Sequence, residues 1–149
     1  MATHHGDDWE FGQDFADLVE YAKAEGAEGY EVHEVRLCEC ASCGGHVFGL
    51  HGDLTENTAK RLCRGCGQEH FIADSGDYWD ESRTGVMVCE CDGDDDEEDF
   101  NIAVGYSLYE GGDGIRALAI TSRCVACGRL GYWDDWMVRG GDIHLLNRA

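Results

Sequence analysis

CASCG at residues 40–44, CRGCG at 63–67 and CVACG at 124–128 repeat one pattern, a C-x-x-C pair followed directly by glycine. A C-x-x-C turn places two thiolates on one cation, and four such sulfurs surround a tetrahedral zinc ion at about 2.3 Å. The glycine lets the backbone take a positive φ, which turns its amides toward the sulfurs. The chain is therefore predicted to fold around thiolate-bound metal ions.

The first two copies form one predicted metal site. Nineteen residues separate Cys43 from Cys63, which is close to the C-x₂-C-x₁₅₋₂₀-C-x₂-C spacing typical of zinc. Nine cysteines, an odd number, and a start without a signal-peptide pattern argue against a secreted disulfide framework. The ligands predicted for the first Zn²⁺ are Cys40, Cys43, Cys63 and Cys66.

The third copy pairs with an irregular C-x-C motif. Cys89 and Cys91 end an apolar, strand-like run, and 32 residues separate this motif from Cys124. This separation indicates an extra hairpin inserted between the two halves of the site. The ligands predicted for a second Zn²⁺ are Cys89, Cys91, Cys124 and Cys127.

One thiol is left over, because two sets of four use eight of the nine cysteines. The runs 35–40 and 86–91 resemble each other and indicate two divergent copies of one unit, and by that logic the first site uses Cys38 and Cys40. The C-x-x-C knuckle instead selects Cys40 and Cys43. We predict that Cys38 is the spare thiol and behaves as a small buried hydrophobic residue, with Cys43 as the alternative.

The C-x-x-C-G pattern resembles the zinc-ribbon class, in which two knuckles at the ends of β-hairpins clamp one Zn²⁺. The resemblance covers residues 35–75 and, with an irregular first knuckle, residues 86–137. It implies an architecture more than an activity, because zinc ribbons occur in transcription, translation, replication and viral proteins. A rubredoxin-like iron electron carrier is an alternative, since four thiolates also bind iron. Rubredoxins, however, hold one such site in a far shorter chain with a wider gap.

Periodicity predicts one N-terminal helix followed by strands. Apolar residues recur at helical spacing over 7–25, with Asp7 or Asp8 as the cap and Gly26 at the end. The rest of the chain alternates or is rich in β-branched and aromatic residues. Strands are expected near 31–38, 46–51, 69–73, 86–91, 100–109, 115–123 and 130–138.

The predicted fold class is therefore small, mainly β and zinc-stabilised, with two tandem zinc-ribbon-like units and one amphipathic helix. The helical segment is assigned to 1–30, the first unit to 31–84, and the second unit, with its longer hairpin, to 85–149. Units this short bury little core, so metal supplies much of their folding free energy. The run 92–99 holds seven acids in eight positions and is interpreted as a solvated turn.

Charge is the second informative feature, since 31 acidic residues against 11 basic ones give −20 over 149 residues. Only two of the basic residues are lysines, and this composition resembles haloarchaeal proteins, whose carboxylates keep the protein soluble. The acidic excess disfavours nucleic acid, because binding it requires Lys and Arg to neutralise phosphates. Four arginines near the second knuckles leave a small basic face as the alternative: Arg61, Arg64, Arg123 and Arg129.

Two aromatic motifs supply the predicted partner-binding residues, which are Tyr78, Trp79, Tyr132, Trp133 and Trp136. Trp and Tyr are enriched at binding hot spots because they bury much area and keep a polar tip. In a small β protein the same residues also pack the core. Both interpretations stay open from the sequence alone.

Together these features favour a non-enzymatic protein with two Zn²⁺ ions. We expect it to act as a protein-interaction or assembly component of a halophilic archaeon or its virus. A protein partner or larger assembly is expected, in the cytoplasm or a virion rather than outside the cell, and no apolar run reaches the ~18 residues of a membrane span. The alternative is a transcription-associated or regulatory zinc ribbon that contacts nucleic acid.

Salt is expected to stabilise the protein. At about 1 M salt the Debye length falls to about 3 Å, so repulsion among the excess carboxylates is largely screened. The free energy of unfolding, measured by urea titration at increasing KCl, should therefore rise with salt. A free energy that stays flat or falls as KCl increases would contradict the halophile interpretation.

Overall fold

The computed structural model describes residues 12–53, 57–73, 75, 79, 84–91, 95–109, 114–138 and 149. Across these residues the chain is mainly β with one helix, which confirms that part of the predicted fold class. The elements are α1 (Phe15–Glu25), β1 (Glu34–Leu37), β2 (Phe48–Asp53), β3 (Thr58–Cys63), β4 (Glu69–Phe71), β5 (Gly85–Val86), β6 (Cys89–Cys91), β7 (Asp95–Glu97), β8 (Phe100–Leu108), β9 (Ile115–Cys124) and β10 (Leu130–Met137).

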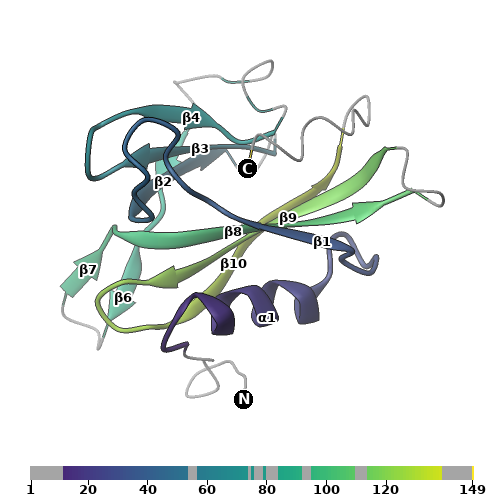
Figure 1. Ribbon diagram of the computed structural model, residues 1–149, viewed down its shortest axis with the longest axis horizontal. Helices are drawn as coiled ribbons and strands as arrows, with labels where there is room; N and C mark the ends of the chain where they lie inside the picture. The colour runs from purple at the N-terminus through teal and green to yellow at the C-terminus, as the bar shows by residue number, and fades with distance from the viewer. Residues whose placement is uncertain are drawn as a thin grey trace.

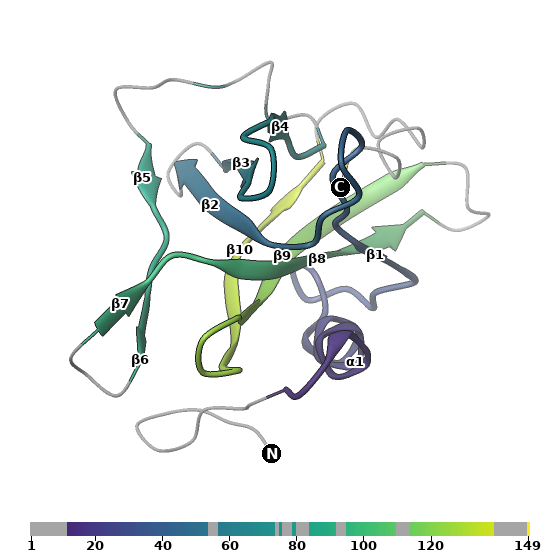
Figure 2. The ribbon, with the colours of Figure 1, turned by 60° about the vertical axis from the view of Figure 1, so that its left-hand side comes forward.

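Eight of these strands form one antiparallel sheet in the order β10-β9-β8-β2-β3-β4, with β1 on β8 and β5 on β2. β9 pairs along one edge of β8, while β1 pairs with its later half and Phe48 of β2 pairs with Phe100 at its start. β6 and β7 form a separate hairpin that projects from the sheet (Figures 1 and 2). Strands from 31–84 and from 85–149 therefore belong to the same sheet.

β8 is the central strand, and it is buried along almost its whole length. Ile102, Val104 and Tyr106 are at most 1% exposed and join the main core. On the other face Ala103 contacts the helix cluster, and a Cβ on Gly105 would lie 3.2 Å from the Val32 side chain. Small residues on this face let the helix and its following loop approach the sheet closely.

The helix α1 packs across the sheet opposite the main core (Figure 2). Leu18 and Ala22 are at most 1% exposed there and contact residues of β1, β8 and β10. The helix begins at Phe15, later than predicted, because the Asp14 carboxylate caps it by accepting the Asp17 N–H at 3.0 Å. Among the described residues no helix is long and apolar enough to cross a membrane.

The structure tests only one end of the predicted helix. Gly26 ends it at a φ of 78°, as predicted. The alternative caps Asp7 and Asp8 lie outside the described residues.

The sequence reasoning missed β3. Two of its central side chains, Lys60 and Arg61, are charged yet only 6% exposed. The Lys60 ammonium lies 5.0 Å from the Trp79 ring centroid, and the Arg61 guanidinium lies 4.7 Å from that of Phe48. Cation–π contacts of this kind let charged side chains occupy a buried strand, which apolar periodicity does not reveal.

β10 carries a half-buried acid beside a register shift between Tyr132 and Asp134. The Asn57 amide donates to the Asp134 carboxylate at 3.2 Å. Burial raises the Asp134 pKa to about 6, and the Asp135 and Glu28 charges add to this. Between about pH 4 and pH 6, Asp134 is therefore protonated in the folded state but ionised in the unfolded chain.

This difference sets a pH dependence for stability. Because the folded-state pKa is raised, Asp134 contributes stability below about pH 4, and that contribution is lost as the pH rises toward about 6. Urea unfolding of the wild type and of Asp134→Asn should show the wild type losing stability relative to the variant across that window. A difference that stays constant from pH 4 to pH 6 would contradict the raised pKa of Asp134.

Candidate metal centres

The three C-x-x-C-G segments fold into the same backbone turn. In each, the glycine N–H donates to the carbonyl of the first cysteine at 2.8 Å, and the N–H of that cysteine donates to the carbonyl five residues later at 2.9 Å. The glycines are Gly44, Gly67 and Gly128, with φ of 74°, 82° and 82°. Other residues are strained at such φ values, so the sequence pattern fixes a knuckle at each position.

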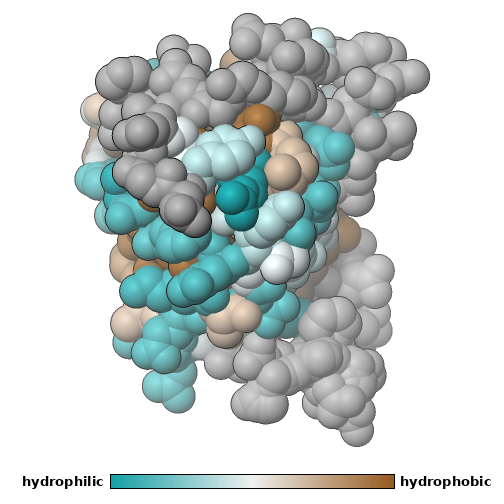
Figure 3. All heavy atoms as spheres, turned by 90° about the vertical axis from the view of Figure 1, so that its right-hand side faces the viewer, coloured by the Kyte–Doolittle hydropathy of each residue, from teal (hydrophilic) through white to brown (hydrophobic). Residues whose placement is uncertain are grey.

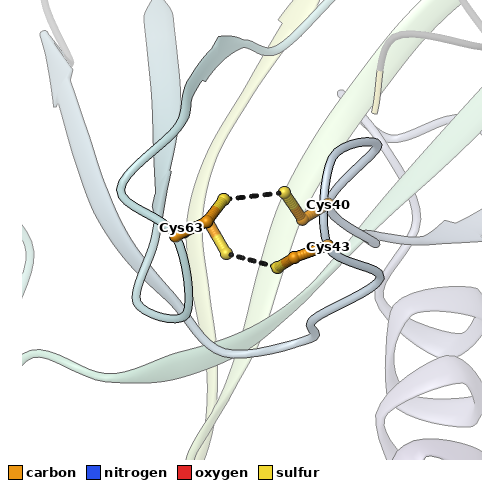
Figure 4. A group of neighbouring side chains, drawn as sticks. Cys40, Cys43 and Cys63 are labelled. Carbon is orange, nitrogen blue, oxygen red and sulfur yellow. Dashed lines mark hydrogen bonds between the residues drawn. The ribbon is translucent and has the colours of Figure 1, made fainter.

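The first cluster brings together Cys40, Cys43, Cys63 and Cys66, whose sulfurs all lie within 4.8 Å of one another. Cys40 Sγ lies 3.5 Å from Cys66 Sγ, and Cys43 Sγ lies 3.5 Å from Cys63 Sγ. These distances exceed the roughly 2.05 Å of a disulfide and approach the edge of about 3.8 Å of a tetrahedron with 2.3 Å metal–sulfur bonds. Figure 4 shows the two knuckles facing each other across this gap.

The backbone of each knuckle favours a thiolate at its first cysteine. The Cys43 N–H donates to Cys40 Sγ and lowers the pKa of Cys40 to about 6. The Cys66 N–H acts in the same way on Cys63 and lowers its pKa. Amides directed at sulfur are the electrostatic feature that the glycine pattern predicted.

The second cysteine of each knuckle resists ionisation. The N–H groups of Gly45 and Gln68 lower the pKa values of Cys43 and Cys66, but contacts with the Cys40 and Cys63 sulfurs together with burial outweigh them, so both pKa values are raised. Four negative charges this close repel one another strongly. A divalent cation removes that conflict, because it binds all four as thiolates.

The surroundings of the first cluster fit a metal site. A Cβ on Gly45 or on Gly65 would lie 3.3 Å from Cys43 Sγ, so a side chain at either position would crowd that sulfur. The Ser42 hydroxyl donates to the Gln68 side-chain oxygen at 2.7 Å, which ties the two knuckles together beside the sulfurs. Gln68 and Ser42 were not found from the sequence, because no spacing rule marks them.

The second cluster joins Cys89 at the start of β6 to the third knuckle. The sulfurs of Cys89, Cys124 and Cys127 lie within 4.8 Å of one another, with 3.7 Å between those of Cys89 and Cys127. Cys91, the fourth predicted ligand, lies in β6, but its side chain is outside the described part of the structure. Three of the four predicted ligands therefore converge.

Cys38 lies outside both clusters. It is 1% exposed in the main core, and burial raises the pKa of its thiol to about 12. The repeat between 35–40 and 86–91 suggested Cys38 as a ligand of the first site, but Cys43 of the C-x-x-C knuckle occupies that position in the cluster. A buried neutral thiol is the state predicted for the spare cysteine, and here the Arg61 guanidinium also lies beside it.

The arginines near the knuckles serve as internal ties. Arg61 donates to the Ala149 carbonyl at 2.9 Å, and Arg64 binds the Asp99 carboxylate at 2.8 Å. Arg123 donates to the Gly12 carbonyl at 2.7 Å. Arg129 lines a cavity beside the second cluster. These contacts draw the guanidinium groups inward and leave little of the basic face considered above.

The predicted partner-binding aromatics are mostly packed. Trp136 is 3% exposed in the main core, Trp133 packs edge-on against Phe100 at 5.6 Å, and Trp79 packs edge-on against Phe71 at 5.4 Å. The hydroxyl of Tyr132 donates to Asp135, and Tyr78 lies outside the described residues. The packing interpretation therefore describes most of this set.

Comparison with known proteins does not assign the chain to a family. No protein-family model, curated protein or solved structure matched the chain. The clusters are compatible with zinc-ribbon-like knuckles and with metal binding, and any further role has to be argued from the structure.

Exchanging single cysteines should separate cluster members from the spare thiol. Cys43→Ser removes one sulfur of the first cluster, so bound metal should fall from about two ions per chain to about one. Cys38→Ala removes a sulfur from the core and should keep both ions while lowering stability by about 1 to 2 kcal/mol. Elemental analysis and native mass spectrometry measure both. Metal loss in Cys38→Ala but not in Cys43→Ser would overturn the assignment.

Proposed function

We propose that the protein is a non-catalytic interaction or assembly component held in shape by two Zn²⁺ ions. The observation that carries this proposal is the first cluster, in which four sulfurs from two knuckles converge. Four cysteines fill all positions of a tetrahedral ion and leave none for a substrate, which is typical of structural zinc sites. In this proposal the metal ions maintain the fold, and the protein surface binds the partner.

Zinc is preferred over iron as the metal in this proposal. Both ions accept four thiolates, but the 19-residue gap, the two clusters and the arginine-containing knuckle favour zinc. A ferric tetrathiolate would be red, whereas a zinc protein is colourless. The absorption spectrum of the purified protein therefore distinguishes the proposal from an electron carrier.

An exposed aromatic cluster that the sequence reasoning missed supports a partner-binding surface. Arg116 of β9 lies with its guanidinium 4.4 Å from the Tyr30 ring centroid and 5.1 Å from that of Tyr109. The two tyrosines are 40% and 45% exposed. Stacked Tyr and Arg side chains are the residue types that dominate binding hot spots. We refer to these three residues as the tyrosine–arginine patch.

The chemistry of the surface favours a specific protein partner over a membrane or nucleic acid. The face in Figure 3 carries hydrophilic side chains at its centre and only scattered hydrophobic ones. Nucleic acid is disfavoured because Arg61, Arg64 and Arg123 bind protein groups. A partner that offers carboxylate or amide groups to Arg116 and apolar edges to the tyrosines fits the patch.

The test is co-purification at high KCl from the organism that encodes the chain. A tagged wild type should recover a partner in stable stoichiometry, and Tyr30→Ala with Tyr109→Ala should lose most of it. Val86→Ala, which alters an exposed apolar side chain on β5, is the matched control and should keep the partner. A strictly monomeric wild type, or a partner retained by the double variant, would contradict the proposal.

A further inference from the structure

Three consecutive residues at the start of β8 connect the two cysteine clusters. Asp99 directly precedes β8, and Phe100 and Asn101 are its first two residues. We refer to these three residues as the bridge segment. Each of them contacts one group in or next to a knuckle of the first cluster and one group in or next to the third knuckle.

Asp99 joins the second knuckle to the third. The guanidinium of Arg64, a residue of the second knuckle, donates to the Asp99 carboxylate at 2.8 Å. The backbone N–H of Val125, a residue of the third knuckle, donates to the Asp99 carbonyl at 3.1 Å. Asp99 therefore holds a knuckle of the first cluster with its side chain and the knuckle of the second cluster with its backbone.

Phe100 joins one ligand of each cluster across the sheet. In the register of the strands, Cys63 of β3 lies opposite Phe48 of β2, and Phe48 lies opposite Phe100 of β8. Phe100 in turn lies opposite Cys124 of β9. Both phenylalanines are at most 1% exposed. A single row of paired, buried residues therefore runs from a predicted ligand of the first ion to a predicted ligand of the second.

Asn101 makes a third connection, which is buried. Its side-chain amide donates to the carbonyl of His46, just after the first knuckle, at 2.9 Å. Its side-chain oxygen accepts from Arg123, just before the third knuckle, at 3.1 Å. Asn101 is 4% exposed, so salt screens these hydrogen bonds less than it screens the exposed ion pair of Asp99.

We infer that the bridge segment couples the two metal sites, so that an ion in one cluster raises the affinity of the other cluster for metal. The inference rests on the proposed function, because it takes both clusters to bind an ion. It assigns Asp99 and Asn101 as positioning residues for metal ions that neither of them touches.

The physical basis of the coupling is that each ion orders its own knuckles. Without the first ion, the crowded sulfurs of the first cluster repel one another, and the knuckles that carry Arg64 and precede His46 are held less firmly. The bridge segment then loses fixed partners on one side and holds the third knuckle less firmly on the other. The second ion must order that knuckle as it binds, which lowers its affinity. By linkage the effect is equal in the opposite direction.

Zinc titrations in competition with a chromophoric chelator measure this coupling. Cys43→Ser leaves the second cluster as the intact site, and Cys127→Ser leaves the first, so each variant gives one single-site affinity. The affinity of the wild type for both ions together should exceed the product of these two affinities at least about fivefold, which is the lower end for coupled sites. Equality of the two values overturns the inference alone, whereas a wild type that binds no zinc overturns the proposed function as well.

Variants at the bridge segment test the route of the coupling, with the two cysteine exchanges repeated in each background. Arg64→Gln combined with Asn101→Ala should remove the excess of the joint affinity over the product. Arg36→Gln, which removes the exposed Arg36–Glu34 pair of β1, is the matched control and should keep the excess. An excess that persists in the combined variant, or one that is lost in Arg36→Gln, overturns the inference.

Two further variants separate the bridge segment from general stability. Asp99→Asn keeps the shape of the side chain and the carbonyl that holds Val125, so it decides the matter if the combined variant fails to fold. It removes the charge that faces Arg64 and should reduce the excess measurably at low salt. Cys38→Ala lowers core stability away from the knuckles and should keep the excess. A wild-type excess in Asp99→Asn, or a lost one in Cys38→Ala, overturns the inference.

Discussion

Repulsion among the four sulfurs of the first cluster is the constraint on which the rest of the structure depends. The backbone lowers the pKa of Cys40 and Cys63, while neighbouring sulfurs keep the pKa of Cys43 and Cys66 raised. A cation bound by all four sulfurs would resolve this conflict and would join the two knuckles. The first knuckle leads into β2 and the second follows β3, and β2 pairs with β3 from Phe48 opposite Cys63, so an ion bound here would hold together the ends of one strand pair.

The central strand β8 determines how the remaining elements are arranged around these clusters. Its large side chains, such as Ile102 and Tyr106, fill the main core, and its small ones, Ala103 and Gly105, lie toward the helix side. Residues alternate between the two faces of a strand, so one nine-residue strand contributes to two packing layers. A sheet that is covered on both faces in this way buries more apolar area than two separate ribbons of this size.

Local sequence patterns predicted much of this structure, but they could not predict contacts between residues far apart in the sequence. The knuckles follow from C-x-x-C-G because each turn is closed by its own residues, and β8, β9 and β10 were located to within one residue from alternation. β3 was missed because Lys60 and Arg61 look like surface residues until Trp79 and Phe48 are placed beside them. The pairing of β1 with β8 depends on which strand edge is free, and no local pattern records that.

The distribution of basic residues explains how such an acidic chain keeps an ordered interior. Lys60 and Arg61 are buried against aromatic rings, and Arg123 binds a backbone carbonyl of the segment leading to α1. Each of these cations therefore holds segments together instead of balancing the surface charge. The surface keeps its excess of carboxylates, and under the proposed function contacts with a partner would concentrate where a guanidinium lies beside exposed aromatic rings. Arg116, beside the exposed rings of Tyr30 and Tyr109, lies in such a place.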